Sequence, residues 1–374
     1  MDRIRRHAAT LGRYVREQVL ELAAGAIAAA FLISGRVTPR AALHAIDVDL
    51  LLVLFALLIA VEILRESGYL DLAVAATVSR FTSTRTFSIA LIAATGVLAS
   101  LVTNDVTLFV VIPFTVLASR MSSFKLENIV VLEVIASNLL GCLTPLGNPQ
   151  NLFVFHRSGW SAAQFILTML PFVGICAAGL LIALFAATER RPMVSPGTPL
   201  PPRNQKLAIA GAVCFTLVLL EIARVVNGWP AAIAATICAA VFLRSRIRDL
   251  DLSIIPLFFF AFIAVEGLRS FDLPRIENMY VSAALVSQLI SNVPATILLA
   301  PFADHDWRTL LYGVNAGGCG TIIASLANLL GWRIYMRDAN SDPRFFWRLT
   351  AFNFAFLVWA GLGGWVLLRA LAPR

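Results

Sequence analysis

Charged side chains are scarce in this chain of 374 residues. Only 14% of the residues are Asp, Glu, Lys or Arg, whereas 59% are hydrophobic, and the mean hydropathy is +0.81. A soluble domain carries about 25% charged residues, so the composition excludes an ordinary soluble protein. It predicts an all-α polytopic membrane protein, because a helix satisfies its own backbone hydrogen bonds in lipid.

Lysine is nearly absent, since Lys125 and Lys206 are the only two, and the net charge of +8 comes from arginine. Most arginines lie between apolar segments, where positive charge sets membrane topology rather than binding nucleic acid. We therefore expect a lipid bilayer, and no nucleic acid, among the partners. The basic N-terminus predicts an uncleaved first span with a cytoplasmic N-terminus, in the inner or plasma membrane of a prokaryote.

Cysteine and histidine are few and scattered. All five cysteines lie inside apolar segments without Cys-x-x-Cys spacing, and the four histidines form no cluster. This pattern predicts neither disulfides nor a zinc site, and no resident cofactor. The motifs His-Glu-x-x-His and Gly-x-Ser-x-Gly are missing as well. A membrane-embedded enzyme is therefore the least favoured alternative, and we expect no enzyme.

What the sequence does contain is a long series of apolar segments. Residues 69–81 are too short to cross a bilayer and predict an interfacial helix. About nine full crossings are predicted, at residues 19–34, 48–64, 126 to beyond 152, 163–187, 207–225, 229–243, 254–268, 308–332 and 346–368.

Two of these crossings are interrupted by small polar residues, and two further segments turn back midway. No α-helix continues through both prolines of Thr144-Pro145-Leu146-Gly147-Asn148-Pro149, which predicts a helix break at 143–150. A second break is expected at 320–326. Residues 87–118 and 279–303 predict two re-entrant hairpins, with tips at 103–105 and 291–294. Irregular backbone survives at membrane depth only inside protein or beside a wet cavity, so these four places form the candidate site.

Three blocks recur in the same order in both halves. Residues 59–65 match 263–269, and Asn104 with Pro113 matches Asn292 with Pro301. The block that begins at Asn138 matches the block that begins at Asn315, and each matching pair of positions is separated by 177 residues.

Counting the crossings gives the orientation of the halves. The first half ends on the side of the membrane where it began. The connector crossing at 207–225 then carries the chain across, so the crossings of the second half begin on the opposite side. We therefore predict two inverted-topology repeats, at 1–187 and 229–374, joined by a linker and connector at 188–228.

The tips and breaks offer neutral oxygens, which suit Na⁺, and half-helix N-termini, which suit an anion. We place Na⁺ at Asn104, Asp105 and Asn148, and again at Asn292 and Ser325. The alternative is that these side chains only repair broken helix ends. The candidate binding residues are Thr103, Asn104, Asp105, Thr144, Asn148, Asn151, Ser291, Asn292, Thr321, Ser325 and Asn328.

Asp105 distinguishes the two halves, because the matching position is Val293. A carboxylate at membrane depth costs on the order of 3 kcal/mol, and such residues usually have a function. Asp105 could bind a cation or exchange a proton, and the alternative is a helix cap. Glu133 and Glu221 are weaker candidates, while Glu62 precedes Arg65 at the spacing of a local ion pair.

Cys142 and Cys319 adjoin the breaks, where they could meet a thiophilic substrate such as arsenite. Close packing also requires small residues at such places, and it is the favoured alternative.

The segments 103–105, 138–152 and 291–296 together resemble the ion transporter superfamily, which includes citrate and dicarboxylate/sodium symporters, arsenite permeases and a sodium/proton antiporter branch. The resemblance implies a scaffold domain and a transport domain made of the two hairpins and two broken helices, alternating access, and a homodimer. Two departures stand out: Asp105 replaces a neutral tip residue of the dicarboxylate branch, and residues 322–326 lack the Pro-x-Gly-Asn-Pro set.

The predicted function is secondary active transport of a small anion, such as citrate, a dicarboxylate, arsenite or a similar oxyanion, coupled to Na⁺ or H⁺. The alternative is a Na⁺/H⁺ antiporter that uses Asp105.

Overall fold

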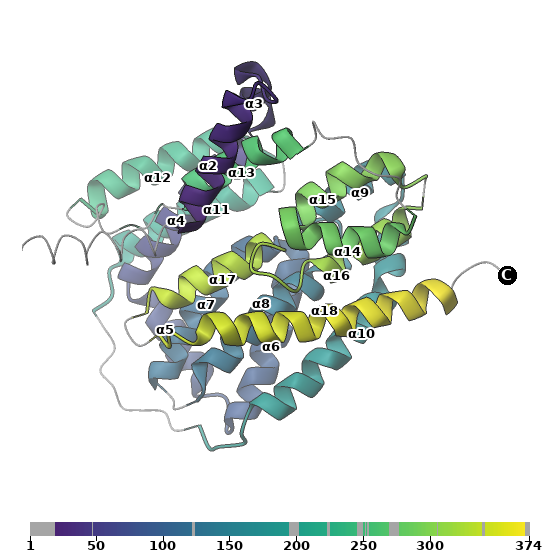
Figure 1. Ribbon diagram of the computed structural model, residues 1–374. Coiled ribbons are helices and arrows are strands. Elements are labelled where there is room, and N and C mark those ends of the chain that lie inside the picture. The colour runs from purple at the N-terminus through teal and green to yellow at the C-terminus, as the bar shows by residue number, and fades with distance from the viewer. Residues whose placement is uncertain are drawn as a thin grey trace, which may run out of the picture. The chain divides into compact units, whose positions relative to one another are not determined.

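The computed structural model is helical throughout the residues that it describes (Figure 1). The basic N-terminal residues, for which a cytoplasmic location was predicted, and the proline-rich centre of the predicted linker lie outside that part of the chain. The described residues are 19–46, 48–121, 124–193, 202–222, 225–244, 250, 252, 254–268, 277–304, 306–338 and 341–370.

The chain divides into two compact units, and each unit draws on both halves of the sequence. Unit 1 consists of residues 1–66 and 205–274, and unit 2 of residues 67–204 and 275–374. Spatial units therefore cut across the sequence repeats expected at 1–187 and 229–374, whose boundaries stay a prediction.

Unit 1 is a bundle in which α4 packs against α11 and α12, while α13 packs against α2 and α3. Small residues let these helices approach closely, as in other membrane bundles. A Cβ atom on Gly211 would come within 2.7 Å of Leu64, and one on Gly228 within 3.0 Å of Leu52. The helices of unit 1 are α2 (Val19–Ile33), α3 (Pro39–Ala45), α4 (Val48–Glu66), α11 (Gln205–Ile222), α12 (Gly228–Phe242) and α13 (Ile254–Leu268).

Unit 2 holds every predicted tip and break. The helices of its first part are α5 (Tyr69–Val78), α6 (Thr84–Leu101), α7 (Asn104–Met121), α8 (Leu126–Leu139), the 3₁₀ turn η1 (Gly141–Leu143), α9 (Pro149–Ser158) and α10 (Ala162–Ala187). Those of its second part are α14 (Met279–Ile290), α15 (Asn292–Leu299), the 3₁₀ turn η3 (Ala300–Phe302), α16 (Trp307–Gly317), α17 (Leu326–Met336) and α18 (Phe345–Ala370).

The interruptions fall where proline and polar residues predict them. Helices α6 and α7 pack together on either side of the first tip, and α14 and α15 do so at the second. Between α8 and α9 the chain leaves helical geometry, and Pro149 opens α9 at its first position. The apolar pattern had suggested a restart at Leu152. Proline begins the helix earlier, because its fixed φ suits the first turn and its missing N–H is not needed there.

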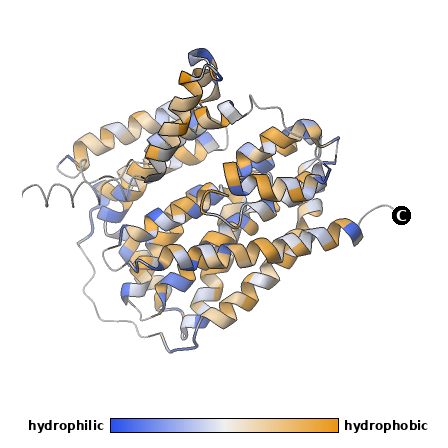
Figure 2. Cartoon of the chain, viewed as in Figure 1, coloured by the Kyte–Doolittle hydropathy of each residue, from blue (hydrophilic) through white to orange (hydrophobic). Residues whose placement is uncertain are grey.

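Four described helices are long and apolar enough to cross a membrane: Thr84–Leu101, Leu126–Leu143, Ala162–Ala187 and Phe345–Ala370. Apolar residues dominate these helices along their length (Figure 2). The first of them is longer than the 87–100 segment expected from the sequence, since Ser83 caps it by accepting a hydrogen bond from the Thr86 amide. The total of about nine crossings and the re-entrant course of the hairpins stay predictions.

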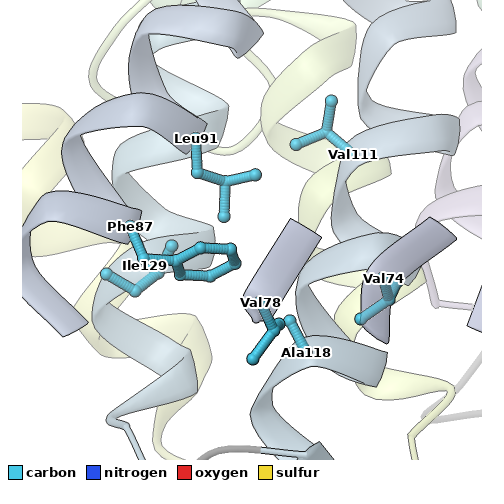
Figure 3. Close-up of a cluster of buried hydrophobic side chains, with 7 residues drawn as sticks. All are labelled: Val74, Val78, Phe87, Leu91, Val111, Ala118 and Ile129. Carbon is cyan, nitrogen blue, oxygen red and sulfur yellow. The ribbon is translucent and has the colours of Figure 1, made fainter. Parts of the chain in front are cut away.

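A cluster of buried apolar side chains packs the first hairpin, α6 and α7, against α5 and α8 (Figure 3). Phe87 lies at its centre and makes an edge-on contact with Phe81, with the ring centroids 5.5 Å apart. Helix α5, expected to be an interfacial helix, buries Val74 and Val78 here. The cluster comprises Val74, Val78, Phe87, Leu91, Val111, Ala118 and Ile129.

Candidate functional site

Each hairpin tip is hydrogen-bonded to the break of its own half. The Asn104 amide donates to the Gly147 carbonyl (2.8 Å), and the Asn292 amide donates to the Ala324 carbonyl (2.9 Å). Positions 104 and 292 are 188 apart, as the two tips are, and positions 147 and 324 are 177 apart, as the two breaks are. The same bond is therefore made twice, once in each half.

The threonines of the two breaks also make corresponding bonds. Thr144 donates from its hydroxyl to the carbonyl of Ser100, and Thr321 donates to the carbonyl of Gln288 (2.9 Å). In the reverse direction, Ser100 donates to the Leu140 carbonyl (2.9 Å). These contacts satisfy carbonyl groups that the interrupted helices leave without partners.

Four buried asparagines join the two halves. Asn138 donates to Asn328 (3.0 Å) and Asn315 donates to Asn151 (2.8 Å), both through side-chain amides. Asn138 corresponds to Asn315, and Asn151 to Asn328, at the spacing of 177. All four side chains are at most 3% exposed, so this is a closed polar network in the interior of unit 2.

Further predicted residues attach to this network. Asn104 donates to the side-chain oxygen of Asn138 (3.1 Å), and the Ser325 hydroxyl donates to the same oxygen (2.8 Å). Asn148 donates to the side-chain oxygen of Asn315 at 3.4 Å. The structure thus brings Asn104, Asn148, Asn151, Ser325 and Asn328 together, and it attaches Thr144, Asn292 and Thr321 through backbone groups.

Several members of the network are not among the binding residues predicted from the sequence. Asn138 and Asn315 are at its centre, and Gln150 donates to Asn315 at 3.2 Å. Gln288 contacts the second break. Asn138 and Asn315 are the first residues of the block that is repeated in the two halves. This repetition is the feature of the sequence that could have identified them.

Asn151 and Asn328 repair the breaks as well as joining the halves. The Asn151 amide donates to the carbonyls of Cys142 (3.2 Å) and Thr144 (3.4 Å). The Asn328 amide does the same for Gly318 (2.9 Å) and Thr321 (3.1 Å). These contacts agree with the alternative that such side chains repair broken helix ends, because each of the two residues satisfies carbonyls that a broken helix leaves without partners.

Four helices begin in this region: α7, α9, α15 and α17. Thr103 accepts from the Val106 amide at the start of α7 (3.3 Å), whereas Asn148 precedes α9 without a capping bond from its side chain. Ser291 precedes α15 with φ +75°, a conformation that non-glycine residues adopt at a cost. Helix N-termini carry partial positive charge, so the four helix starts in this region favour an anion through their dipoles, although the first N–H groups of α7 already donate within the protein.

Besides one oxygen of Glu133, two buried side-chain oxygens of the described first half have no hydrogen-bond partner. They are Oδ1 of Asp105 and Oδ1 of Asn148, whose residues are 7% and 1% exposed. Both residues directly follow the pair joined by the Asn104–Gly147 hydrogen bond. Buried polar atoms are rarely left unpaired, and carboxylate and amide oxygens suit a hard cation, while a carboxylate also binds a proton.

The other acidic candidates lie elsewhere. Glu133 is fully buried on α8, where it accepts a hydrogen bond from Thr115 of α7 (2.5 Å). Glu221 lies on α11 in unit 1. Glu62 and Arg65 are 3.9 Å apart, as expected of a local pair.

A cavity of about 390 Å³ lies in unit 2 at the ends of α6, α7, α8 and α10, and none of the predicted binding residues line it. Glu189 lines it and bridges Lys125 (3.1 Å) and Arg191 (2.5 Å). Hydrogen bonds from these two cations hold the pKa of Glu189 below its ordinary value.

Comparison with known proteins connects this geometry to a family. The family model described as citrate transporter matches residues 15–306, which is most of the chain. This chain belongs to the citrate transporter family. Membership confirms the resemblance to the ion transporter superfamily that the tips and breaks indicated.

Full-length relatives agree with that assignment. The inner membrane protein YbiR of Escherichia coli K12 is 31% identical over 346 residues, covering 89% of this chain and 91% of YbiR. The uncharacterized transporter MJ0456 of Methanocaldococcus jannaschii is 34% identical over 308 residues, covering 80% of this chain and 84% of that protein. The human P protein is 28% identical over 158 residues, 40% of this chain and 18% of the P protein. The chain is therefore a multi-pass membrane transporter.

Proposed function

We propose that this protein is a secondary active transporter that moves a small carboxylate or oxyanion by alternating access, coupled to Na⁺ or H⁺. The substrates that fit this proposal are citrate, a dicarboxylate, arsenite or a similar oxyanion. The observation that carries it is the buried network in which both hairpins and both helix breaks meet. The matched family is described as citrate transporters, and that description supports a carboxylate substrate.

The inverted-repeat architecture belongs to this proposal. Its support is that the hydrogen bonds from tip to break, from threonine to hairpin, and between asparagines all occur in corresponding pairs. Two repeats of opposite orientation place such a site at their interface, near the bilayer midplane. The homodimer expected from the resemblance is likewise proposed.

Helix polarity supports an anionic substrate. Helices α7, α9, α15 and α17 all start at residues of the network, so the positive ends of four helix dipoles lie there. These dipoles stabilise a carboxylate or oxyanion without needing an arginine, and alternating access then exposes it to each side in turn.

Asp105 supports cation coupling. Its buried carboxylate has an unpartnered oxygen, and the corresponding position in the second half is the neutral Val293. The same observation favours one second function, a Na⁺/H⁺ antiporter in which Asp105 alternately binds the two ions. In either case Asp105 is the residue whose charge changes during the cycle.

Purified protein in liposomes tests the proposal. Uptake of labelled citrate, succinate, arsenite and phosphate is measured with and without a Na⁺ gradient, and again with a pH gradient. A pH dye that reports proton movement driven by Na⁺ alone, without any anion, identifies the antiporter instead.

The variant Asp105→Asn is expected to lose coupling while keeping its elution profile, because the amide has nearly the same shape. Asp71→Asn is the matched control, since Asp71 lies in the first turn of α5 and outside the network. Full coupled transport by Asp105→Asn would refute the role of this carboxylate.

A further inference from the structure

The second break contains a feature that the first one lacks. The side-chain amide nitrogen of Gln288 lies among three backbone carbonyl oxygens and donates to Gly317 (2.8 Å), Cys319 (2.9 Å) and Ala284 (3.1 Å). Its carbonyl oxygen accepts from the Thr321 amide at 2.9 Å. Gln288 therefore uses both ends of its amide to satisfy the irregular backbone of the second half.

The corresponding residue of the first half is too short for this role. Ser100 lies 188 positions before Gln288, and its hydroxyl, which has one proton, faces the carbonyls of Gly96 (2.9 Å) and Leu140 (2.9 Å). The hydroxyl cannot serve both carbonyls at once. A side chain with two donors thus stands in the second half where a side chain with one donor stands in the first.

The unpaired oxygens show the same asymmetry. Asp105 and Asn148 each leave a buried oxygen without a partner. Their counterparts are Val293, which has no polar group, and Ser325, whose hydroxyl donates to Asn138 and accepts from the Ala327 amide. The tip and break of the first half thus have oxygens available to a cation. At the second tip and break, Ser325 is already hydrogen-bonded and the amide of Gln288 donates to the backbone carbonyls.

We infer that this transporter uses one cation site, at Asp105 and Asn148, and that the amide of Gln288 occupies the backbone carbonyls of the second break so that no ion binds them. The inference rests on the proposed function for the role of the first site. The sequence predicted two Na⁺ sites, and this inference keeps only the first. The second, at Asn292 and Ser325, is not used. To bind to these carbonyls, an ion would have to displace the side-chain amide of Gln288, which is neutral and is part of the protein.

Counting bound ions on purified protein tests this directly, without any transport. Binding of ²²Na⁺ at saturation is measured for the wild type, for Gln288→Glu and for Asp105→Asn. Gln288→Glu keeps the size of the side chain but replaces its two N–H donors by an oxygen, so the carbonyl oxygens and the new carboxylate are expected to hold one Na⁺ more than the wild type does. Gln164→Glu, at an exposed position in the first turn of α10, is the matched control and is expected to add none.

The outcomes separate the inference from the proposed function. The wild type is expected to bind one Na⁺ that Asp105→Asn abolishes, or none if its coupling ion is the proton. In both cases Gln288→Glu adds one. Two ions bound to the wild type, or no gain in Gln288→Glu, would overturn the inference, whereas absence of transport in liposomes would overturn only the proposed function.

If Gln288→Glu does not fold, Gln288→Ser replaces it in the test. This variant puts the residue of the first hairpin into the second and removes the amide from the three carbonyls. It is expected to bind one Na⁺ more than the wild type, and an equal count contradicts the inference.

Discussion

Replacing Asn315 by alanine tests whether the asparagine network holds the site together. Asn315 donates to the side-chain oxygen of Asn151 (2.8 Å) and accepts from Gln150 (3.2 Å) and Asn148 (3.4 Å). All these side chains are at most 1% exposed, so water cannot easily take the place of the missing amide. Alanine removes both the donor and the acceptor at once.

The magnitude follows from the groups left behind. The side-chain oxygen of Asn151 loses its donor and the amide of Gln150 loses its acceptor, while Asn148 keeps a bond to the carbonyl of Asn138 (3.3 Å). An unsatisfied buried polar group costs about 1–3 kcal/mol, so two of them cost about 2–6 kcal/mol. In a unit of this size, that corresponds to a fall in apparent Tm of roughly 4–24 °C.

Thermal unfolding in detergent, followed by tryptophan fluorescence at one fixed heating rate, measures the fall. Asn353→Ala is the matched control, because Asn353 is also a buried asparagine of unit 2. Its amide bonds only to the Leu349 carbonyl of its own helix, and its side-chain oxygen has no partner. We expect the control to change stability by about 1 kcal/mol or less.

Asn138→Ala, at the corresponding position, is expected to lower the apparent Tm at least as much as Asn315→Ala, because it removes a hydrogen-bond partner from Asn104, Ser325 and Asn328. If Asn315→Ala lowered the apparent Tm no more than Asn353→Ala does, the network would not be a stabilising element. The reasoning from its hydrogen bonds would then fail.

Two further predictions concern the first break and the cavity beside it. Gly147→Ala is expected to disrupt folding, because its Cβ would overlap the carbonyl oxygen of Gly141, whereas Gly174→Ala meets nothing within 4 Å and should fold normally; fluorescence-detected gel filtration compares the two. In the variant Glu189→Gln, the apparent Tm should fall less on acidification than it does in the wild type. The pKa of Glu189 in the folded protein is lowered from its ordinary value of 4.5, so its ion pairs stabilise the protein at pH values above 4.5. This stabilisation is lost as the pH falls through the lowered pKa. At pH 7 the same variant should change the apparent Tm little, because the ion pairs are exposed, and a large change there would contradict this assignment.

Much of the local structure could be predicted from the sequence. Helix α10 (Ala162–Ala187) begins one residue before the expected span 163–187 and ends with it, and the interruption after α8 includes Pro145 and ends at Pro149. Such features depend on hydropathy and on proline, which act over a few neighbouring residues. The composition likewise identified a helical membrane protein, and the paired tips and breaks identified its superfamily.

The partners of the polar side chains could not be predicted. Asn315 bonds to Asn151, which is 164 residues away, and no periodicity encodes that pairing. Gln288 lies on a mostly apolar helix, and only the position of the second break beside it gives the side chain its role. The packing of α5 could not be predicted either, because a short apolar helix has the same sequence pattern at a membrane interface and against a neighbouring helix. Its interfacial position stays a prediction.

The difference between the halves explains how a nearly symmetric frame could support a directional cycle. The paired amide hydrogen bonds are neutral, so they can fix the positions of tips and breaks without any change of charge. Within the tips, a carboxylate is present only at Asp105, because the second half has Val293. Burying one charge is costly, and one monovalent cation or proton offsets it. On the proposed assignment, the frame therefore supplies the geometry for both orientations, while the single carboxylate makes the loaded and empty states differ in charge. A second acidic tip at position 293 would double that cost, and the amide of Gln288 already satisfies the carbonyls that could otherwise help to bind its counter-ion.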